Sequence, residues 1–511
     1  MQRPSQHGVF TVLAGLCVCL LPLGQGACRP APARPSILLI VVDSLRADHL
    51  HHAGDPRRLS PDLDDLAAES TRFSQAFAAA PWTTPSVMSL FTGLTPSHHH
   101  VDNSDRSLAA SVTLLAERLK RAGYATGAVM PALTLADHFG FKRGFDQFVM
   151  EQQGHGRVSS PWTMAHALSF IHDHAAEPFF LYLHFWDVHY NYNPPMPYAV
   201  RFQSGRPPGS PADDDITRHV LEGPDQKPLP ADRVEWLEGQ YAGEINYTDD
   251  QIGRLLRNLD GLGLDENTIV VVTADHGEGF QEHGILGHTI QLYDEMVHVP
   301  LLVRWPGRVA PGRVVEQPVG LVDLAPTLLD LAGFRLSGGQ FDGESRAAEL
   351  VGEAASPATP GRPILLGTSR RAGLRGLRGA HRLFLRDLVS GKEELYDLDL
   401  DPGQQTNLAG ARPGEAKAWR LRLCSRLAQP PAQGEIPIVP MAPAIKAALD
   451  AGLRTLGYVG GGPSSRHRGV DPAAERRNRL ESLDCPAVIP GSVRDDAAPA
   501  GNDDGRSPAG R

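Results

Sequence analysis

The segment 268–279 (TIVVVTADHGEG) decides the fold of this chain. Its first seven residues are apolar or β-branched, which is typical of a strand buried on both faces of a sheet. A second run of this kind, Ser36–Val42 (SILLIVV), lies near the start of the chain. The first run ends at Asp275-His276 and the second at Asp43. Because strands buried on both faces occur in parallel sheets covered by helices, the two runs predict an α/β fold.

The chain alternates between strand-like and helix-like segments up to about residue 355. The predicted strands are 36–42, 125–129, 179–184, 268–274 and 300–304, with an extended segment at 72–78. The predicted helices are 63–69, 112–121, 163–174, 234–259 and 322–332. We therefore expect a mostly parallel central sheet flanked by helices, with functional residues beyond the carboxyl ends of the strands.

The composition changes after this α/β domain, which we place at 36–355. Short strand-like pieces with close turns follow at 364–368, 374–378, 382–385 and 395–398, and an amphipathic helix at 442–456. They predict a small antiparallel α+β subdomain at 356–458. The remainder, 459–511, has few apolar residues and is expected to be a disordered tail.

The N-terminus predicts export from the cytoplasm. Arg3 precedes an apolar run at 9–23 and small residues, so that 1–27 is typical of a signal peptide. Cys28 follows Gly26-Ala27 as in a lipoprotein cleavage site, and 28–35 is a Pro-rich tether. Gln25 stands where an aliphatic residue is expected, so three alternatives stay open: a periplasmic or extracellular protein, a lipid anchor on Cys28, and an uncleaved anchor.

The charge pattern argues against nucleic acid as a partner. The chain of 511 residues has a formal net charge of −10, and its Lys and Arg residues do not gather into a stripe.

The segment 81–93 (PWTTPSVMSLFTG) predicts a loop that continues into a helix. Thr84 is the predicted N-cap, and Pro85 occupies the first helical position, where no N–H partner is needed. Thr83 then lies at the positive end of the helix dipole, near free backbone N–H groups. An oxygen nucleophile or an oxyanion is stabilised at such a place. By itself, the segment favours an ordinary capped helix.

Asp43, Asp275 and His276 predict a metal site together with Thr83. Carboxylates that follow buried strands are costly side by side unless a cation lies between them. Two carboxylates, an imidazole and a hydroxyl suit Zn²⁺ or Mn²⁺ well, and Ca²⁺ or Mg²⁺ less well.

At these residues the chain resembles the sulfatase family, within the alkaline phosphatase superfamily, from about residue 37 to 408. The motifs occur in the family's order. They are 40–48 (IVVDSLRAD), 83–86 (TTPS), 90–93 (LFTG), 179–184 (FFLYLH) with His189 and Pro194-Pro195, 275–278 (DHGE), 287–288 (GH), 293–295 (YDE), 299–301 (VPL), 395–398 (LYDL), 401–402 (DP) and 407–408 (NL).

The resemblance implies a role for each matching residue. Thr83 takes the nucleophile position, and Asp43, Asp275 and His276 match metal ligands. His189 matches a contact to the substrate oxyanion, and His288 falls near a further basic residue beside the anion.

The chain departs from the family at the nucleophile itself. Sulfatases carry a cysteine that is matured to formylglycine at position 83 and an arginine at position 87, where this chain has Thr83 and Val87. No formylglycine is therefore expected. Ser44 replaces a second ligand carboxylate, and the family's lysine–histidine motif is not recognisable near 124–141. A formylglycine hydrate releases sulfate by collapsing to the aldehyde, which a threonine ester cannot do, whereas a phospho-threonine can be resolved by water or an alcohol.

We therefore predict a metal-dependent, sulfatase-like hydrolase that cleaves sulfate or phosphate esters with Thr83 as the nucleophile. The backbone N–H groups at Thr84–Ser86 and either His189 or His288 are expected to stabilise the equatorial oxygens, while a histidine protonates the leaving alcohol. The expected substrate is a small molecule, or a glycan- or lipid-linked ester. Two alternatives stay open: a phosphoryl or headgroup transferase that uses an alcohol acceptor, and a non-catalytic, anion-binding homologue.

Overall fold

A computed structural model of the protein describes residues 34–150, 159–203, 226–353, 361–369, 373–431 and 433–455, together with 205, 207, 216, 217, 219 and 220. The predicted signal segment 1–27, most of the tether 28–35 and the tail 459–511 lie outside these residues.

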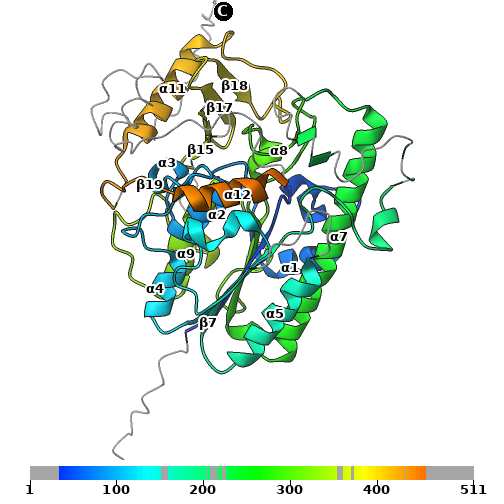
Figure 1. Ribbon diagram of the computed structural model, residues 1–511, viewed down its shortest axis with the longest axis vertical. Coiled ribbons are helices and arrows are strands. Elements are labelled where there is room, and N and C mark those ends of the chain that lie inside the picture. Colours follow the sequence, from blue (N-terminus) through cyan, green and yellow to red (C-terminus); the bar gives the residue numbers. More distant parts are fainter. Residues whose placement is uncertain are drawn as a thin grey trace, which may run out of the picture. The chain divides into compact units, whose positions relative to one another are not determined.

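The core is an eight-stranded sheet in the order β13-β2-β12-β8-β1-β7-β5-β6. Figure 1 marks this sheet by its strand β7. Its strands are β13 (Val314–Val315), β2 (Thr71–Phe73), β12 (Leu301–Arg304), β8 (Thr268–Ala274), β1 (Ser36–Val42), β7 (Phe179–Phe185), β5 (Ala125–Met130) and β6 (Gln147–Met150). β12 runs antiparallel to β8 and β2, and the other pairs are parallel. All residues of β1, β7 and β8 are buried, as their apolar composition predicts. The predicted mostly parallel sheet is confirmed.

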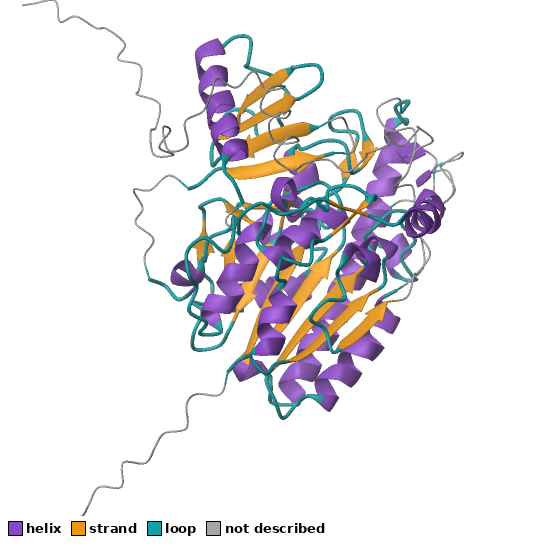
Figure 2. Ribbon diagram, turned by 60° about the vertical axis from the view of Figure 1, so that its left-hand side comes forward, coloured by secondary structure: helices purple, strands orange, loops and turns teal. Residues whose placement is uncertain are grey.

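Helices cover both faces of this sheet (Figure 2). On one face α1 (Pro61–Glu69) and α5 (Ser160–Asp173) pack against the long α7 (Ala231–Gly261). On the other, α2 (Thr83–Thr92), α4 (Leu115–Arg121) and α9 (Leu324–Leu331) pack against one another. Among the described helices, none is both long and apolar enough to cross a membrane.

Short elements complete the large part of the molecule. The helices are α3 (Pro96–His99), α8 (Asp294–Val297) and α10 (Ala347–Leu350). Short 3-10 turns lie at Ala47–His49, His51–Ala53, Leu133–Leu135, Asp137–Phe139, Tyr198–Val200, Asp265–Asn267 and Leu321–Asp323. β11 (His298–Val299), β3 (Ala76–Phe77) and β14 (Val319–Gly320) form one small sheet, and β9 (Gly279–Phe280) pairs with β10 (Leu286–Gly287).

The predicted small antiparallel sheet near the C-terminus is also confirmed. Its strands are β15 (Ile364–Thr368), β16 (Leu374–Arg378), β17 (Arg382–Asp387) and β18 (Glu393–Asp397), and α11 (Pro413–Ala428) packs against it around a separate apolar cluster. The chain then returns to the large part of the molecule. β19 (Val439–Pro440) pairs with β4 (Arg106–Ser107), and α12 (Pro443–Thr455) packs against the turn Leu133–Leu135.

Candidate active site

The site lies where β1, β7 and β8 end at one edge of the sheet. Val42 is in register with Ala274, so Asp43 and Asp275 follow neighbouring strands at the same level. His184 on β7 is opposite Val41. Parallel strands therefore bring three groups together that are far apart in the sequence.

Helix α2 brings Thr83 to this edge. All ten of its residues are buried, and it begins at Thr83 with Trp82 as the N-cap. The prediction that Thr84 caps this helix was wrong, because the Thr84 hydroxyl turns away and donates to the carbonyl of Thr134 at 2.7 Å. The Ser86 hydroxyl donates to the carbonyl of Asp275 at 2.5 Å, which fastens the helix to the end of β8.

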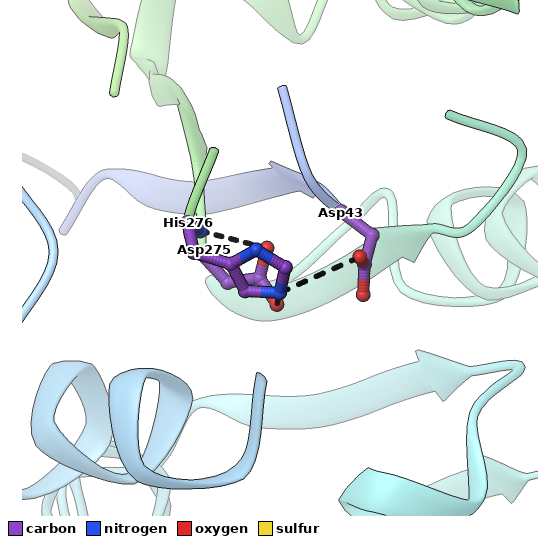
Figure 3. A group of neighbouring side chains, drawn as sticks. All are labelled: Asp43, Asp275 and His276. Carbon is purple, nitrogen blue, oxygen red and sulfur yellow. Dashed lines mark hydrogen bonds and ion pairs between the residues drawn. The ribbon is translucent and has the colours of Figure 1, made fainter. Parts of the chain in front are cut away.

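Thr83, Asp43, Asp275 and His276 surround one buried point. The Thr83 hydroxyl lies 3.3 Å from Oδ2 of Asp43 and 3.4 Å from Nε2 of His276. Nε2 of His276 lies 3.7 Å from Oδ1 of Asp43 and 3.5 Å from Oδ2 of Asp275 (Figure 3). One ligand atom from each of Asp43, Asp275 and His276 lies within 4.8 Å of the others.

The donor atoms of this group fit a divalent metal. Oδ1 of Asp275 accepts hydrogen bonds from the backbone N–H groups of Ser44 and His276, but its buried Oδ2 has no hydrogen-bond partner among the described residues. Nδ1 of His276 donates to the carbonyl of Gly277 at 2.8 Å, so a lone pair remains on Nε2. Zn²⁺ or Mn²⁺ would use such a pair of ligands, a carboxylate oxygen that accepts no hydrogen bond and an imidazole lone pair directed to the same point.

The charges of the site also favour a bound metal ion. Burial, followed by the charge of Asp43, raises the pKa of Asp275 to about 6. Burial also acts to raise the pKa of Asp43, but His189, His184 and His276 together hold it below its ordinary value. Burial acts to lower the pKa of His276, but the charges of Asp275 and Asp43 raise it, and the net result is an increase. The repulsion between the carboxylates is what a bound cation would relieve.

Two further histidines border this group. The ring of His288 lies 4.3 Å from that of His276 and 5.0 Å from that of His189, measured between centroids. His189 donates from Nδ1 to the carbonyl of Tyr190 and stacks on Trp186. Both histidines predicted from the resemblance therefore lie beside the site.

The other predicted contacts are placed differently. The side chains of Thr84 and Ser86 are held by backbone carbonyls, and the N–H of Ser86 donates to the carbonyl of Trp82 at 3.4 Å. Ser44 replaces a ligand carboxylate with a donor, since its hydroxyl donates to Oδ1 of Asp43 at 2.7 Å.

No role was predicted from the sequence for three residues of the site, which are Tyr182, His184 and Glu278. His184 contacts Oδ2 of Asp43 at 3.0 Å and Tyr182 at 2.8 Å. Glu278 contacts Nδ1 of His288 at 3.0 Å. The position of His184 at the end of a buried strand was the available signal, but a histidine there is equally typical of a core contact.

Comparison with known protein families identifies the family of this chain. The sulfatase family model matches residues 35–334, more than half of the chain. The chain belongs to the sulfatase family. It is a sulfatase-like ester hydrolase, and this family uses a divalent metal.

Several known proteins are similar over most of their length. An ulvan-active sulfatase of Formosa agariphila is 28% identical over 74% of this chain and 78% of its own length. A Δ4,5-hexuronate-2-O-sulfatase of Bacteroides thetaiotaomicron is 26% identical over 77% of this chain and 87% of its own. The crystal structure of a phosphonate monoester hydrolase of Agrobacterium radiobacter matches the fold with a TM-score of 0.65, at 23% identity, over 78% of this chain and 96% of that one.

Proposed function

We propose that this sulfatase homologue hydrolyses sulfate or phosphate esters with the Thr83 hydroxyl as nucleophile and a divalent metal held by Asp43, Thr83, Asp275 and His276. The single observation that supports this most is the position of the Thr83 hydroxyl, 3.3 Å from Asp43 and 3.4 Å from His276 at the buried start of α2. A metal bound there would act as a Lewis acid that lowers the pKa of the Thr83 hydroxyl.

The residues of the chain then divide the chemistry between two steps. In the first, the Thr83 hydroxyl gives its proton to Oδ2 of Asp43, the acceptor of its hydrogen bond, and the Thr83 oxygen forms a bond to sulfur or phosphorus. The bond to the leaving alcohol breaks, and His288 or His189 donates a proton to that alcohol. In the second, water displaces Thr83 and the same histidine accepts the proton of that water. The proton held by Asp43 returns to the Thr83 oxygen, which restores the free hydroxyl. Glu278 holds Nδ1 of His288, which orients the ring for both proton transfers.

The chemistry of threonine favours phosphorus. A threonine ester has no second hydroxyl with which to expel the bound group, so water must attack sulfur or phosphorus directly. A phospho-threonine can be resolved in this way by activated water, whereas attack on a sulfo-threonine is slow. We therefore expect phosphate or phosphonate monoesters to be turned over faster than sulfate esters.

The relatives suggest which leaving groups to test first. The ulvan-active and hexuronate-2-O-sulfatases are named for carbohydrate esters. We propose sugar esters as the substrate class and a location outside the cytoplasm, in agreement with the predicted signal segment 1–27 and with Cys28 as a lipid attachment site.

The test is a substrate panel with the metal-loaded protein. Aryl sulfate, aryl phosphate, an aryl phosphonate monoester, a phosphodiester and sulfated sugars are assayed with Zn²⁺ or Mn²⁺, and intact mass is recorded after rapid quenching. We expect an added phosphoryl group on Thr83, loss of turnover in Thr83→Ala, and partial activity in Thr83→Ser.

Thr92→Ala is the matched control, because Thr92 is a buried threonine of the same helix whose hydroxyl donates to the carbonyl of Met88 at 2.7 Å. It should keep full activity per folded molecule. Turnover that survives Thr83→Ala would contradict the nucleophile. Transfer of the phosphoryl group to added alcohols in preference to water would favour the transferase, and anion binding without turnover would favour the non-catalytic homologue.

A further inference from the structure

A chain of hydrogen bonds leads from strand β7 into the site. The Tyr182 hydroxyl lies 2.8 Å from Nδ1 of His184, and Nε2 of His184 lies 3.0 Å from Oδ2 of Asp43. The Thr83 hydroxyl donates to the same Oδ2 at 3.3 Å. All four residues are completely buried.

The strand fixes the direction of this chain. Tyr182 and His184 are two positions apart, so their side chains lie on the same side of β7, and β7 runs between β1 and β5 in the middle of the sheet. Their rings are stacked with centroids 6.1 Å apart. A donor built on a central strand is held more rigidly than one built on a loop.

The direction of each hydrogen bond follows from its acceptor. The Ser44 and Thr83 hydroxyls both donate to the carboxylate of Asp43, so Asp43 is the acceptor and Nε2 of His184 is the donor. In the neutral imidazole Nδ1 is then the acceptor, and the Tyr182 hydroxyl donates to it. Tyr182 therefore selects the tautomer of His184 that binds Asp43.

Asp43 is consequently held through both of its oxygens. The Ser44 hydroxyl donates to Oδ1 at 2.7 Å, while His184 donates to Oδ2. Oδ1 faces Nε2 of His276 at 3.7 Å, across the point that a metal would occupy. A rotation of this carboxylate would remove a ligand oxygen from the site and an acceptor from Thr83.

We propose that Tyr182 and His184 are positioning residues that hold the Asp43 carboxylate in the orientation needed for metal binding and for contact with the Thr83 hydroxyl. The inference rests on the metal site of the proposed function. Partners of this kind, which contact a ligand rather than the metal, tune metal affinity by about 10- to 100-fold.

The experiment measures metal binding rather than turnover. Full-length protein stripped with EDTA is titrated with Zn²⁺ in a calorimeter and with Co²⁺ by visible absorption. The variants are Tyr182→Phe, which removes one oxygen, His184→Leu, which removes the donor, and His184→Gln, whose amide N–H reaches the place of Nε2.

We expect Tyr182→Phe and His184→Leu to weaken Zn²⁺ binding about tenfold or more and to change the Co²⁺ spectrum. His184→Gln should restore most of the affinity, which a role in packing alone would not explain. Tyr124→Phe is the matched control. Tyr124 is a buried tyrosine that directly precedes β5, at the end of the strand away from the site. Its hydroxyl has no hydrogen-bond partner among the described residues. It should bind both ions as the wild type does.

Several outcomes would overturn the inference. Unchanged affinity and an unchanged Co²⁺ spectrum in Tyr182→Phe would do so even if His184→Leu failed to fold, and so would equal losses in Tyr182→Phe and Tyr124→Phe. A wild type that binds neither ion would overturn it together with the metal site. If the Tyr182 and His184 variants bind metal more weakly but the wild type cleaves no ester, the inference stands and the proposed function is refuted. If the wild type cleaves esters but the variants bind metal as tightly as the wild type does, the proposed function stands and the inference is refuted.

Discussion

Replacing Asp275 by asparagine should stabilise the metal-free protein and destabilise the metal-loaded one. Oδ1 of Asp275 accepts two backbone N–H groups, at 3.2 Å from Ser44 and 2.9 Å from His276, and asparagine keeps such an oxygen. Oδ2 lies 3.5 Å from Nε2 of His276 and has no hydrogen-bond partner among the described residues, so an amide nitrogen in its place breaks no hydrogen bond. The substitution therefore removes a buried charge with little change of shape.

The size of the effect follows from the pKa. Burial, and then the charge of Asp43, raises the pKa of Asp275 from 3.8 to about 6. One pKa unit corresponds to about 1.4 kcal/mol, so the ionised carboxylate costs the metal-free fold about 3 kcal/mol. Part of the gain is lost in the variant, because the Asp275 charge supports the raised pKa of His276. We expect a net stabilisation of about 2 kcal/mol at pH 7 to 8.

The pH dependence has a definite sign. An acid whose pKa is higher in the folded state contributes its full stability below the unfolded pKa and loses it as the pH rises through the folded pKa. The metal-free wild type should therefore lose stability between about pH 4 and pH 6 to 7, while Asp275→Asn should lose less. At low pH the two proteins should be equally stable.

The assay is urea unfolding in EDTA from pH 4 to 8, repeated with saturating Zn²⁺ or Mn²⁺. Saturation at 100 times the dissociation constant stabilises the wild type by about 2.7 kcal/mol, and the variant gains less because it lacks a ligand. The order of the two urea midpoints should thus reverse when metal is added. A variant that is less stable than the wild type in EDTA at pH 8, or an order that metal does not reverse, would refute the reasoning.

Asp342→Asn is the control for this experiment. Asp342 is also buried, but Nδ1 of His98 lies 2.7 Å from its Oδ2, and the charge of His98 lowers its pKa although burial acts to raise it. Removal of a paired charge leaves the partner buried alone. This variant should be less stable than the wild type with and without metal.

Two further substitutions test the helix that carries Thr83 and the histidine beside it. Gly93→Ala should lower the free energy of unfolding by about 1 to 3 kcal/mol. Gly93 has φ = 66°, and a Cβ at this position would lie 2.5 Å from Cδ1 of Phe341. An unchanged urea midpoint would contradict this expectation. Glu278→Gln should lower kcat about tenfold or more with a smaller change in KM, because Glu278 orients His288. Steady-state kinetics at one pH measure both constants. An unaltered kcat would show that this hydrogen bond has no part in turnover.

The strands and the fold class were predictable because their signal is local. The buried runs Ser36–Val42 and Thr268–Ala274 are strands with the predicted bounds, and the four short pieces after residue 360 form the expected antiparallel sheet. Helix ends were less certain, since they depend on contacts made elsewhere. Helix α2 begins before Thr84 because Thr134, from a turn after β5, takes the Thr84 hydroxyl.

The sequence by itself determined that Asp43 and Asp275-His276 end two buried strands and that Thr83 begins a helix, because hydrophobic runs and turn residues specify such places locally. Only the tertiary structure decided how these groups meet. The parallel register of β1 with β7 and β8 brings Nε2 of His184 to Asp43 and places the Tyr182 hydroxyl 2.8 Å from Nδ1 of the same ring. The contact between His184 and Asp43 joins residues 141 positions apart, and it depends on strand order and side-chain direction, which no local pattern contains.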